Sequence, residues 1–224
     1  PAEIEVADLT SLALELALWG GDALPFLTAP NPGAMAEARA LLENLGALQA
    51  GRITDHGKVL AALPLHPRLA HMLALAGPKA APLAALIAER DPLRGAPPDL
   101  ALRLAAVTDP RKFEAAHPYP VSRPVIERIR EESRRLSRAM PQPSDSELSL
   151  GQMAALAYPD RIGLRRKGDA PRWVLSGGKG AVMAAGTPLA AARLIVATDL
   201  DGDAREATVR QAVAITEAEL REVH

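Results

Sequence analysis

The sequence predicts a mainly α-helical protein that ends in a smaller β-rich region. Hydrophobic residues make up 48% of the 224 residues, but aromatic residues make up only 3%, and alanine and leucine supply most of the rest. This composition favours packed helices over a sandwich of sheets. Prolines divide the chain up to Met140 into segments with helical spacing, whereas short runs of β-forming residues separated by glycines follow Tyr158.

The chain begins with a pattern of two helices. Leu9 to Trp19 is apolar on nearly all sides, which indicates a buried helix, and Gly20-Gly21 ends it. Asn31-Pro32 is typical of an N-cap followed by the first helical residue. The apolar residues of this second helix recur at helical spacing: Met35, Ala38, Leu41, Leu42 and Leu45.

A small hairpin and a third helix come next. Gly46 is placed to stop the second helix, and the segment from Leu48 to Thr54 predicts a hairpin with its turn at Ala50-Gly51. Thr54 can cap the helix that Pro64 ends. This order of elements predicts a winged-helix domain over residues 1–63.

Four helices are expected between residues 64 and 140, as a helical bundle. Short helices joined by short connections favour antiparallel packing. The last helix begins near Ser122, a candidate cap. The expected helices are Pro67 to Ala76, Pro82 to Arg90, Asp99 to Val107, and Ser122 to Met140.

Residues 141–149, PQPSDSELS, are the predicted linker, and residues 150–224 the predicted β-rich region. A short helix from Leu150 to Tyr158 precedes the strands. Gly177-Gly178 and Asp201-Gly202 are predicted turns. Strands are expected near Arg161 to Arg166, Arg172 to Leu175, Ala181 to Met183, Arg193 to Thr198, and Thr208 to Ile215.

Several motifs together resemble a known family. They are LGAL from Leu45, GRIT-x-HG from Gly51 and LPLHPRLAHML from Leu63, with DLTSLALELALWG upstream and ERDPLRG downstream. In this order they resemble the join between winged helix and ratchet domain in DEAH/RHA-type helicases, and most closely the bacterial HrpB type. The resemblance is weaker after Ala96. It implies a winged helix, a helical ratchet bundle and an OB-like region, the C-terminal accessory region without the motor domains.

The same resemblance implies a function. The parent protein would use ATP hydrolysis to move along RNA or unwind it, with ATP and Mg²⁺ held by motor domains of the same chain. The accessory modules would grip RNA or another single strand as part of its channel. The chain starts at Pro1 without methionine, so we interpret it as a piece of such a protein. Whether the OB-like barrel is complete stays open, because Glu217 to His224 is typical of an opening helix.

Charge is distributed unevenly along the chain. Residues 1–63 carry 3 basic and 8 acidic residues, residues 64–140 carry 13 and 8, and residues 141–224 carry 10 and 11. Any attraction for phosphate therefore lies in the middle block. The candidate surface is the helix from Ser122 to Met140, and its candidate nucleic-acid-binding residues are Arg128, Arg134, Arg135 and Arg138.

Two interpretations of this arginine-rich helix stay open. Arginine forks suit phosphate, and contacts with the nucleic-acid backbone need no sequence code. However, Glu127, Glu131 and Glu132 can pair with arginines at helical spacing, so the helix can also be a solvated outer face. For the helix as a whole the two interpretations are about equal.

A second basic cluster follows Tyr158. Arg165 and Arg166 are its candidate contacts for nucleic acid, with Arg161, Lys167 and Arg172 nearby. Cations interleaved with aromatic rings suit single strands, whose bases stack on rings. Tyr158 and Trp173 are the only rings at hand, and Trp173 fits a core position better because a large aromatic on a strand is usually buried.

Other motifs do not predict catalysis or cofactor binding. Ser176-Gly177-Gly178-Lys179-Gly180 lacks the hydroxyl and the spacing of a phosphate loop, so we expect no ATP hydrolysis by this chain. Asp199, Asp201 and Asp203 lack the glycine and glutamate of a calcium loop. A cap or surface role is favoured for the internal histidines, His56, His66, His71 and His117, and a structural ion pair for Arg68.

Two alternative functions remain from sequence. The chain can be a protein-interaction platform with little affinity for nucleic acid, or its winged helix can read DNA, although Arg39 alone is a thin basis for that. Without cysteine there is no disulfide or Cys-ligated zinc, which fits the cytoplasm. We expect no membrane partner, because no apolar run approaches the roughly 20 residues that span a bilayer.

Overall fold

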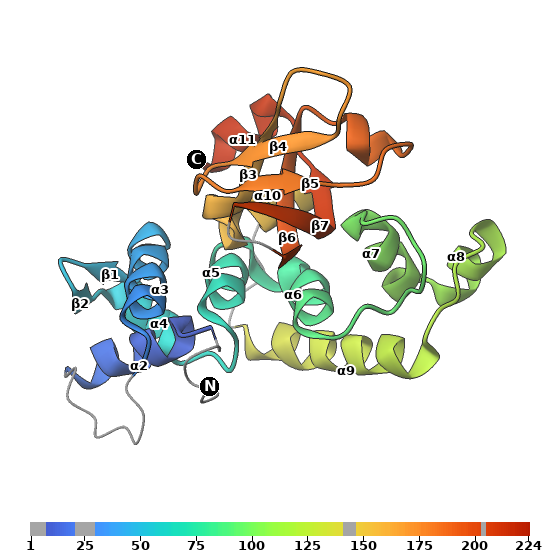
Figure 1. The fold of residues 1–224 in the computed structure, drawn as a ribbon. Coiled ribbons are helices and arrows are strands. Elements are labelled where there is room, and N and C mark those ends of the chain that lie inside the picture. Colours follow the sequence, from blue (N-terminus) through green and yellow to red (C-terminus); the bar gives the residue numbers. More distant parts are fainter. Residues whose placement is uncertain (1–7, 21–29, 141–146, 203–204) are drawn as a thin grey trace. The chain divides into compact units, whose positions relative to one another are not determined.

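The computed structural model describes residues 8–20, 30–140, 147–202 and 205–224 (Figure 1). The chain folds as two compact units, Pro1–Ala74 and Leu75–His224. Helices dominate the described residues, and one small closed sheet lies in the second unit. The predicted fold class, mainly α with a smaller β-rich part, is confirmed at this level.

The first unit packs helices against a two-stranded hairpin. Its shared core includes Leu14 and Leu16 from the first helix, Leu42 from the second and Leu60 from the third. Leu18 and Trp19 are 41% and 78% exposed, so the first helix is buried on one side only, not all round as predicted. The elements are α2 (Thr10–Trp19), α3 (Pro32–Asn44), β1 (Leu48–Gln49), β2 (Arg52–Ile53), α4 (Asp55–Ala61) and α5 (Pro67–Ala76).

Local caps explain where these helices begin. The Asn31 side chain accepts a hydrogen bond from the Ala34 amide at 3.1 Å, which confirms the predicted cap. Thr54 accepts one from the Gly57 amide at 3.0 Å, and its hydroxyl donates to the Gly46 carbonyl at 2.6 Å. Thr54 therefore ties the start of α4 to the end of α3.

Gly57 of the GRIT-x-HG motif is required by close packing. It lies in the first turn of α4, where a Cβ atom would overlap the Ala47 carbonyl oxygen and the Ile53 side chain. Only glycine lets the backbone of α4 approach the hairpin this closely. The glycine of this motif therefore has a packing role in the first unit.

We predict that Gly57→Ala destabilises the first unit by about 2 kcal/mol, because the backbone at Ala47 must move to make room. The free energy of unfolding from urea titration, followed by circular dichroism, measures the effect. Lys58→Ala, at the next and exposed helical position, is the matched control and should change stability little. Equal stability of the two variants would contradict the packing argument.

Asp8 and His66 link the two ends of the first unit. His66 Nε2 lies 3.0 Å from Asp8 Oδ2, and Asp8 Oδ1 accepts hydrogen bonds from the Thr10 amide and hydroxyl. The hydrogen bond with His66, followed by those from Thr10, holds the pKa of Asp8 well below its usual range. The Asp8 carboxylate is therefore stabilised in its charged form.

A depressed pKa predicts a pH dependence of stability. Asp8 stabilises the folded state above the pKa of an unfolded aspartate, about 3.9, and this contribution is lost as the pH falls below it. Asp8→Asn should therefore lower the free energy of unfolding at pH 6, with the difference from wild type shrinking towards pH 3. Urea titrations at both pH values measure this. A difference that stays constant across the range would contradict it.

The second unit begins with helices that pack around α9 (Arg123–Ala139). Asp109 ends one helix and caps the next, since its side chain accepts a hydrogen bond from the Lys112 amide at 3.1 Å. The sequence prediction missed this next helix, α8. Ser122 holds the N-cap position of α9, but its side chain makes no capping hydrogen bond there. The other helices are η1 (Gly77–Ala80), α6 (Ala81–Ala88), α7 (Leu100–Thr108), α8 (Pro110–Ala116) and α10 (Leu150–Ala157).

Five strands then close into a barrel in the order β3-β4-β5-β7-β6, in which only the β5–β7 pair is parallel. The barrel, whose completeness the sequence left open, is therefore closed in this chain. Asp201 and Gly202 lie within the last residues of β6 rather than in a turn, which corrects the prediction. The strands are β3 (Ile162–Arg165), β4 (Arg172–Leu175), β5 (Gly180–Val182), β6 (Leu194–Gly202) and β7 (Glu206–Ala214), with η2 (Pro159–Arg161) and η3 (Pro188–Ala191) beside them and α11 (Glu217–Val223) after them.

The structure bears differently on the predicted linker and on the expectation that no long apolar run occurs. Most of the predicted linker, residues 141–146, lies outside the described residues. Among the described residues, one helical stretch, Pro67–Ala88, is long and apolar enough to cross a membrane by length and composition, and 61% of its 18-residue apolar window is buried within the structure. This stretch consists of α5, η1 and α6 and is mostly buried, and the buried core of a protein passes the same test, so it does not contradict the expectation of no membrane partner.

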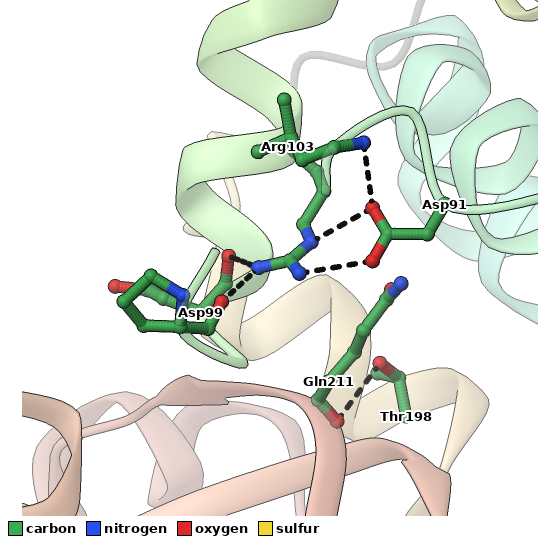
Figure 2. A network of polar contacts seen from close by, with 7 residues as sticks. Asp91, Asp99, Arg103, Thr198 and Gln211 are labelled. Atoms are coloured by element: carbon green, nitrogen blue, oxygen red, sulfur yellow. Dashed lines mark hydrogen bonds and ion pairs between the residues drawn. The ribbon is translucent and has the colours of Figure 1, made fainter. Parts of the chain in front are cut away.

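A buried arginine joins the helices of the second unit to the barrel. The Arg103 side chain is 3% exposed, and its Nε and Nη2 atoms bind the two oxygens of Asp91 at 3.2 and 2.9 Å. Its Nη1 donates to the Pro97 and Asp99 carbonyls (Figure 2). The intervening Pro98 carbonyl accepts a hydrogen bond from the Ala212 amide of β7 at 2.8 Å. Arg103 therefore shapes the loop that contacts the barrel.

We predict that Arg103→Met destabilises the second unit by about 3 kcal/mol, because it leaves Asp91 and two carbonyls without their donor. Asp91 is partly exposed, which keeps the cost at the low end. Emission of the buried Trp173 during urea unfolding, in a Trp19→Phe background, reports this unit. Arg221→Met, at an exposed arginine of α11, is the control. A loss below about 1 kcal/mol would contradict the argument.

Candidate nucleic-acid interface

The helix α9 presents one apolar and one charged face. Val125, Ile126, Ile129 and Leu136 are buried, which confirms the predicted apolar stripe. The spacing of 3.6 residues per turn then directs Glu127, Glu131, Arg134 and Arg138 to the opposite side. The charged face of α9 is therefore the solvent face of the helix.

Two of the four candidate arginines on α9 are paired with carboxylates. Arg135 contacts Glu132 at 2.5 and 2.9 Å, and Arg128 lies 3.5 Å from Glu89. The Arg90 amide, followed by Arg128, holds the pKa of Glu89 below its ordinary value. Both arginines remain about half exposed, so each pair is a surface pair and of small energetic value.

The other two candidates carry charge that no carboxylate balances. Arg138 Nε donates to the Arg134 carbonyl at 3.3 Å, so the two residues lie one turn apart on the same face. Neither side chain makes an ion pair with any residue in the described part of the chain. Both side chains are exposed. Arg134 and Arg138 are therefore two exposed cations one turn apart on α9, and we call them the α9 arginine pair.

The second basic cluster is divided by its contacts. Arg165 donates to three carbonyls, those of Ala190, Gly168 and Asp169, at 3.1 to 3.5 Å. It therefore holds the loop after β3, and binding phosphate would cost these bonds. Arg166 is exposed, and its side chain makes no hydrogen bond or ion pair with a described residue.

The rings of this cluster cannot serve as a stacking platform. Trp173 is fully buried in the barrel, and its Nε1 donates to the Ala192 carbonyl at 3.0 Å, as its predicted core role requires. Tyr158 is 7% exposed, and the Arg161 guanidinium lies over its ring at 5.4 Å. Neither ring of this cluster is therefore accessible to a base, and for Trp173 this is the core position favoured from sequence.

The remaining motifs have structural roles. The Ser176 to Lys179 segment forms the turn between β4 and β5, as predicted, with Gly178 at φ +95°. Asp201 pairs with Arg210 at 2.8 Å, whereas Asp203 lies outside the described residues. Burial raises the pKa of Asp199. No group of three or more metal-ligating side chains occurs in the described ranges.

The histidines of the first unit pair with one another or with an acid. His56 Nε2 lies 2.7 Å from His71 Nδ1, a contact between α4 and α5 that the separation of 15 residues did not reveal. Burial lowers the pKa of His56, which favours its neutral form. Arg68 is 8% exposed, which fits a structural role better than a contact with nucleic acid. These residues therefore hold the unit together.

Known proteins are similar to this chain in sequence and in fold. No protein-family model matches the chain. The ATP-dependent RNA helicase HrpB of Escherichia coli strain K12 is 29% identical over 203 residues, which cover 87% of this chain and 23% of the helicase. The chain resembles one region of HrpB.

Two solved structures extend the likeness to the fold. The crystal structure of the E. coli DExH-box NTPase HrpB matches with a TM-score of 0.78 and 28% identity, over 99% of this chain and 26% of that one. The crystal structure of the Escherichia coli DEAH/RHA helicase HrpB matches with a TM-score of 0.75 and 27% identity, over 96% of this chain and 26% of that one. The resemblance to HrpB predicted from the motifs is confirmed, and the chain spans about a quarter of the length of these relatives.

Proposed function

We propose that this chain is the accessory nucleic-acid-gripping region of an ATP-dependent RNA helicase of the HrpB type. It forms part of the channel for the strand, while the motor domains of the parent protein bind ATP and Mg²⁺ and supply the power stroke. The proposal assigns residues 1–63 to a winged helix, 64–140 to a ratchet bundle and 150–224 to an OB-like barrel. Its partners are RNA and those motor domains, in the cytoplasm.

The α9 arginine pair is the observation that carries this proposal. Arg134 and Arg138 are exposed, lie one turn apart and have no carboxylate partner among the described residues. A guanidinium fork binds phosphate oxygens and needs no base sequence. A helicase must hold a strand of any sequence while the strand moves, and this chemistry suits that task.

The paired arginines can contribute as well. An exposed pair such as Arg135–Glu132 is screened by solvent and weak, so a phosphate can displace the carboxylate at little cost. Arg128 is in the same position with Glu89. Among the candidates, Arg165 fits the proposal least, because its three carbonyl bonds are replaced only by disordering a loop.

A docking platform with little affinity for nucleic acid is the second candidate. It is favoured by a formal net charge of −1 and by the glutamates that interrupt the charged face of α9. On this alternative, α9 contacts a protein partner or the motor domains, and its arginines pair with acidic side chains there. Binding to RNA separates the two functions directly.

We predict that the chain binds single-stranded RNA with an affinity that falls as salt rises, and that Arg134→Gln with Arg138→Gln weakens this binding. Each lost phosphate contact should reduce the slope of log K against log salt by about 0.7, so the double variant should lose about 1.4. Fluorescence anisotropy with a labelled oligouridine, from 25 to about 200 mM KCl, measures both quantities.

The control variant removes the same charge elsewhere in the second unit. Arg193→Gln with Arg221→Gln takes away two exposed arginines near α11, and it should leave affinity and slope within error of wild type. An absence of binding at the lowest salt would favour the docking platform. A preference for one duplex DNA sequence would favour a regulator.

A further inference from the structure

Three rings stack in series where α8 ends. Phe113 is 3% exposed, and the His117 ring lies over it with centroids 4.5 Å apart and 29° between the planes. Tyr119 continues the series, 6.2 Å from His117 and inclined by 15°. His117 and Tyr119 are partly exposed. The series therefore runs from the core of the bundle to its surface, and we call it the α8 ring stack.

The backbone holds Tyr119 in a fixed position. Pro118 and Pro120 flank it, and each fixes its own φ angle and restricts the residue before it. The Pro120 carbonyl accepts a hydrogen bond from the Arg94 amide at 3.1 Å, and Leu93 and Val121 form an antiparallel bridge. The ring is therefore preorganised. Stacking of a ligand on it costs little conformational entropy of the protein.

Exposed cations occur on α8 and on the segment that pairs with Pro120. Arg94 sits on the strand-like segment opposite Pro120, and Arg111 and Lys112 lie in the first turn of α8. All three are exposed, and none forms an ion pair within the described ranges. The Glu114 carboxylate on α8 accepts two hydrogen bonds from Arg123, one from Nε at 2.8 Å and one from Nη2 at 3.0 Å. The Asp109 cap of α8 is exposed as well, so Arg94, Arg111 and Lys112 leave these two segments with a net positive charge.

We propose that the α8 ring stack is a binding site for a nucleobase of single-stranded RNA, with Arg94, Arg111 and Lys112 on the neighbouring phosphates. Bases stack on tyrosine and histidine rings whatever their identity, because each base has a flat π face. This inference rests on the proposed function and adds base contacts to the phosphate contacts of α9. Neither candidate cluster from sequence included these residues.

The geometry separates this role from simple packing. Of the three rings, Phe113 is buried in the core of the bundle, whereas the two outer rings leave part of their surface open. In Figure 1, α8 lies at the end of α9 where that helix begins, held there by Arg123 and Glu114. A strand that follows α9 from Arg138 towards Arg123 therefore reaches the α8 ring stack.

Two oligonucleotides test this site: oligouridine and an abasic strand with the same sugar–phosphate backbone. Wild type should bind oligouridine more tightly than the abasic strand. Tyr119→Ala should weaken binding to oligouridine about tenfold, the size expected for one lost stack, and leave the abasic strand within twofold. Tyr119→Phe keeps the ring and should retain wild-type affinity for both.

A second variant gives a direct signal from the site. In a Trp19→Phe background, Tyr119→Trp should show quenched emission with oligouridine and unchanged emission with the abasic strand. Equal weakening of both strands by Tyr119→Ala, or equal binding of both by wild type, would overturn the base site while leaving phosphate binding by α9 intact. The base site would also be overturned if affinity fell only in the variant Arg134→Gln with Arg138→Gln, and by the same factor for both strands. Binding of neither strand would overturn both proposals.

Discussion

The second unit depends on one buried ion pair between Arg103 and Asp91. The guanidinium is almost completely removed from water, and it is satisfied by two carboxylate oxygens and two carbonyls. Charge burial of this kind costs several kcal/mol unless every donor finds an acceptor. The loop from Asp91 to Asp99 must therefore adopt the one conformation that supplies those acceptors. The network fixes that conformation more than it adds stability.

That same loop makes two connections within the unit. Through Pro98 it pairs with β7 of the barrel, and through Arg94 and Leu93 it pairs with the segment that carries Tyr119. Arg103 itself lies on α7, next to α8. A single loop, shaped by a single arginine, therefore determines where the barrel, the α8 ring stack and the start of α9 lie relative to one another. The ERDPLRG motif supplies the first half of this loop, which explains its value as a signature.

Local signals in the sequence predicted most of the elements, and tertiary contacts decided the rest. Asn31-Pro32, Thr54 and Asp99 marked helix starts correctly because a capping side chain acts within three residues. Helix α8 was missed because Asp109 ends one helix and begins another, and a stop signal alone was expected. Pairs such as His56–His71 and Arg103–Asp91 depend on packing between helices, which no spacing rule reveals.

In the candidate site, too, local sequence signals predicted some features and tertiary contacts decided the others. The amphipathic pattern of α9 followed from sequence, since periodicity determines which face is buried. Which arginines keep an unbalanced charge did not follow, because Arg128 pairs with a residue 39 positions away and Arg165 binds carbonyls of two loops. The core position favoured for Trp173 followed from sequence, whereas the burial of Tyr158 did not. Trp173 lies on a strand of the small barrel and is buried in its core, and Tyr158 is buried just after α10, whereas the proline-flanked Tyr119 stays partly exposed.

The low net charge of the chain is consistent with a gripping role under the proposed function. A strand that must move cannot be held by many strong contacts, because each phosphate contact must break at every step. Two unbalanced arginines on α9 and one ring stack at its end would give a modest, sequence-independent affinity that salt weakens. Glutamates on the same face lower that affinity further and keep the helix from trapping the strand. On this argument the acidic residues of α9 tune the grip, and a uniformly basic helix would hold RNA too tightly for translocation.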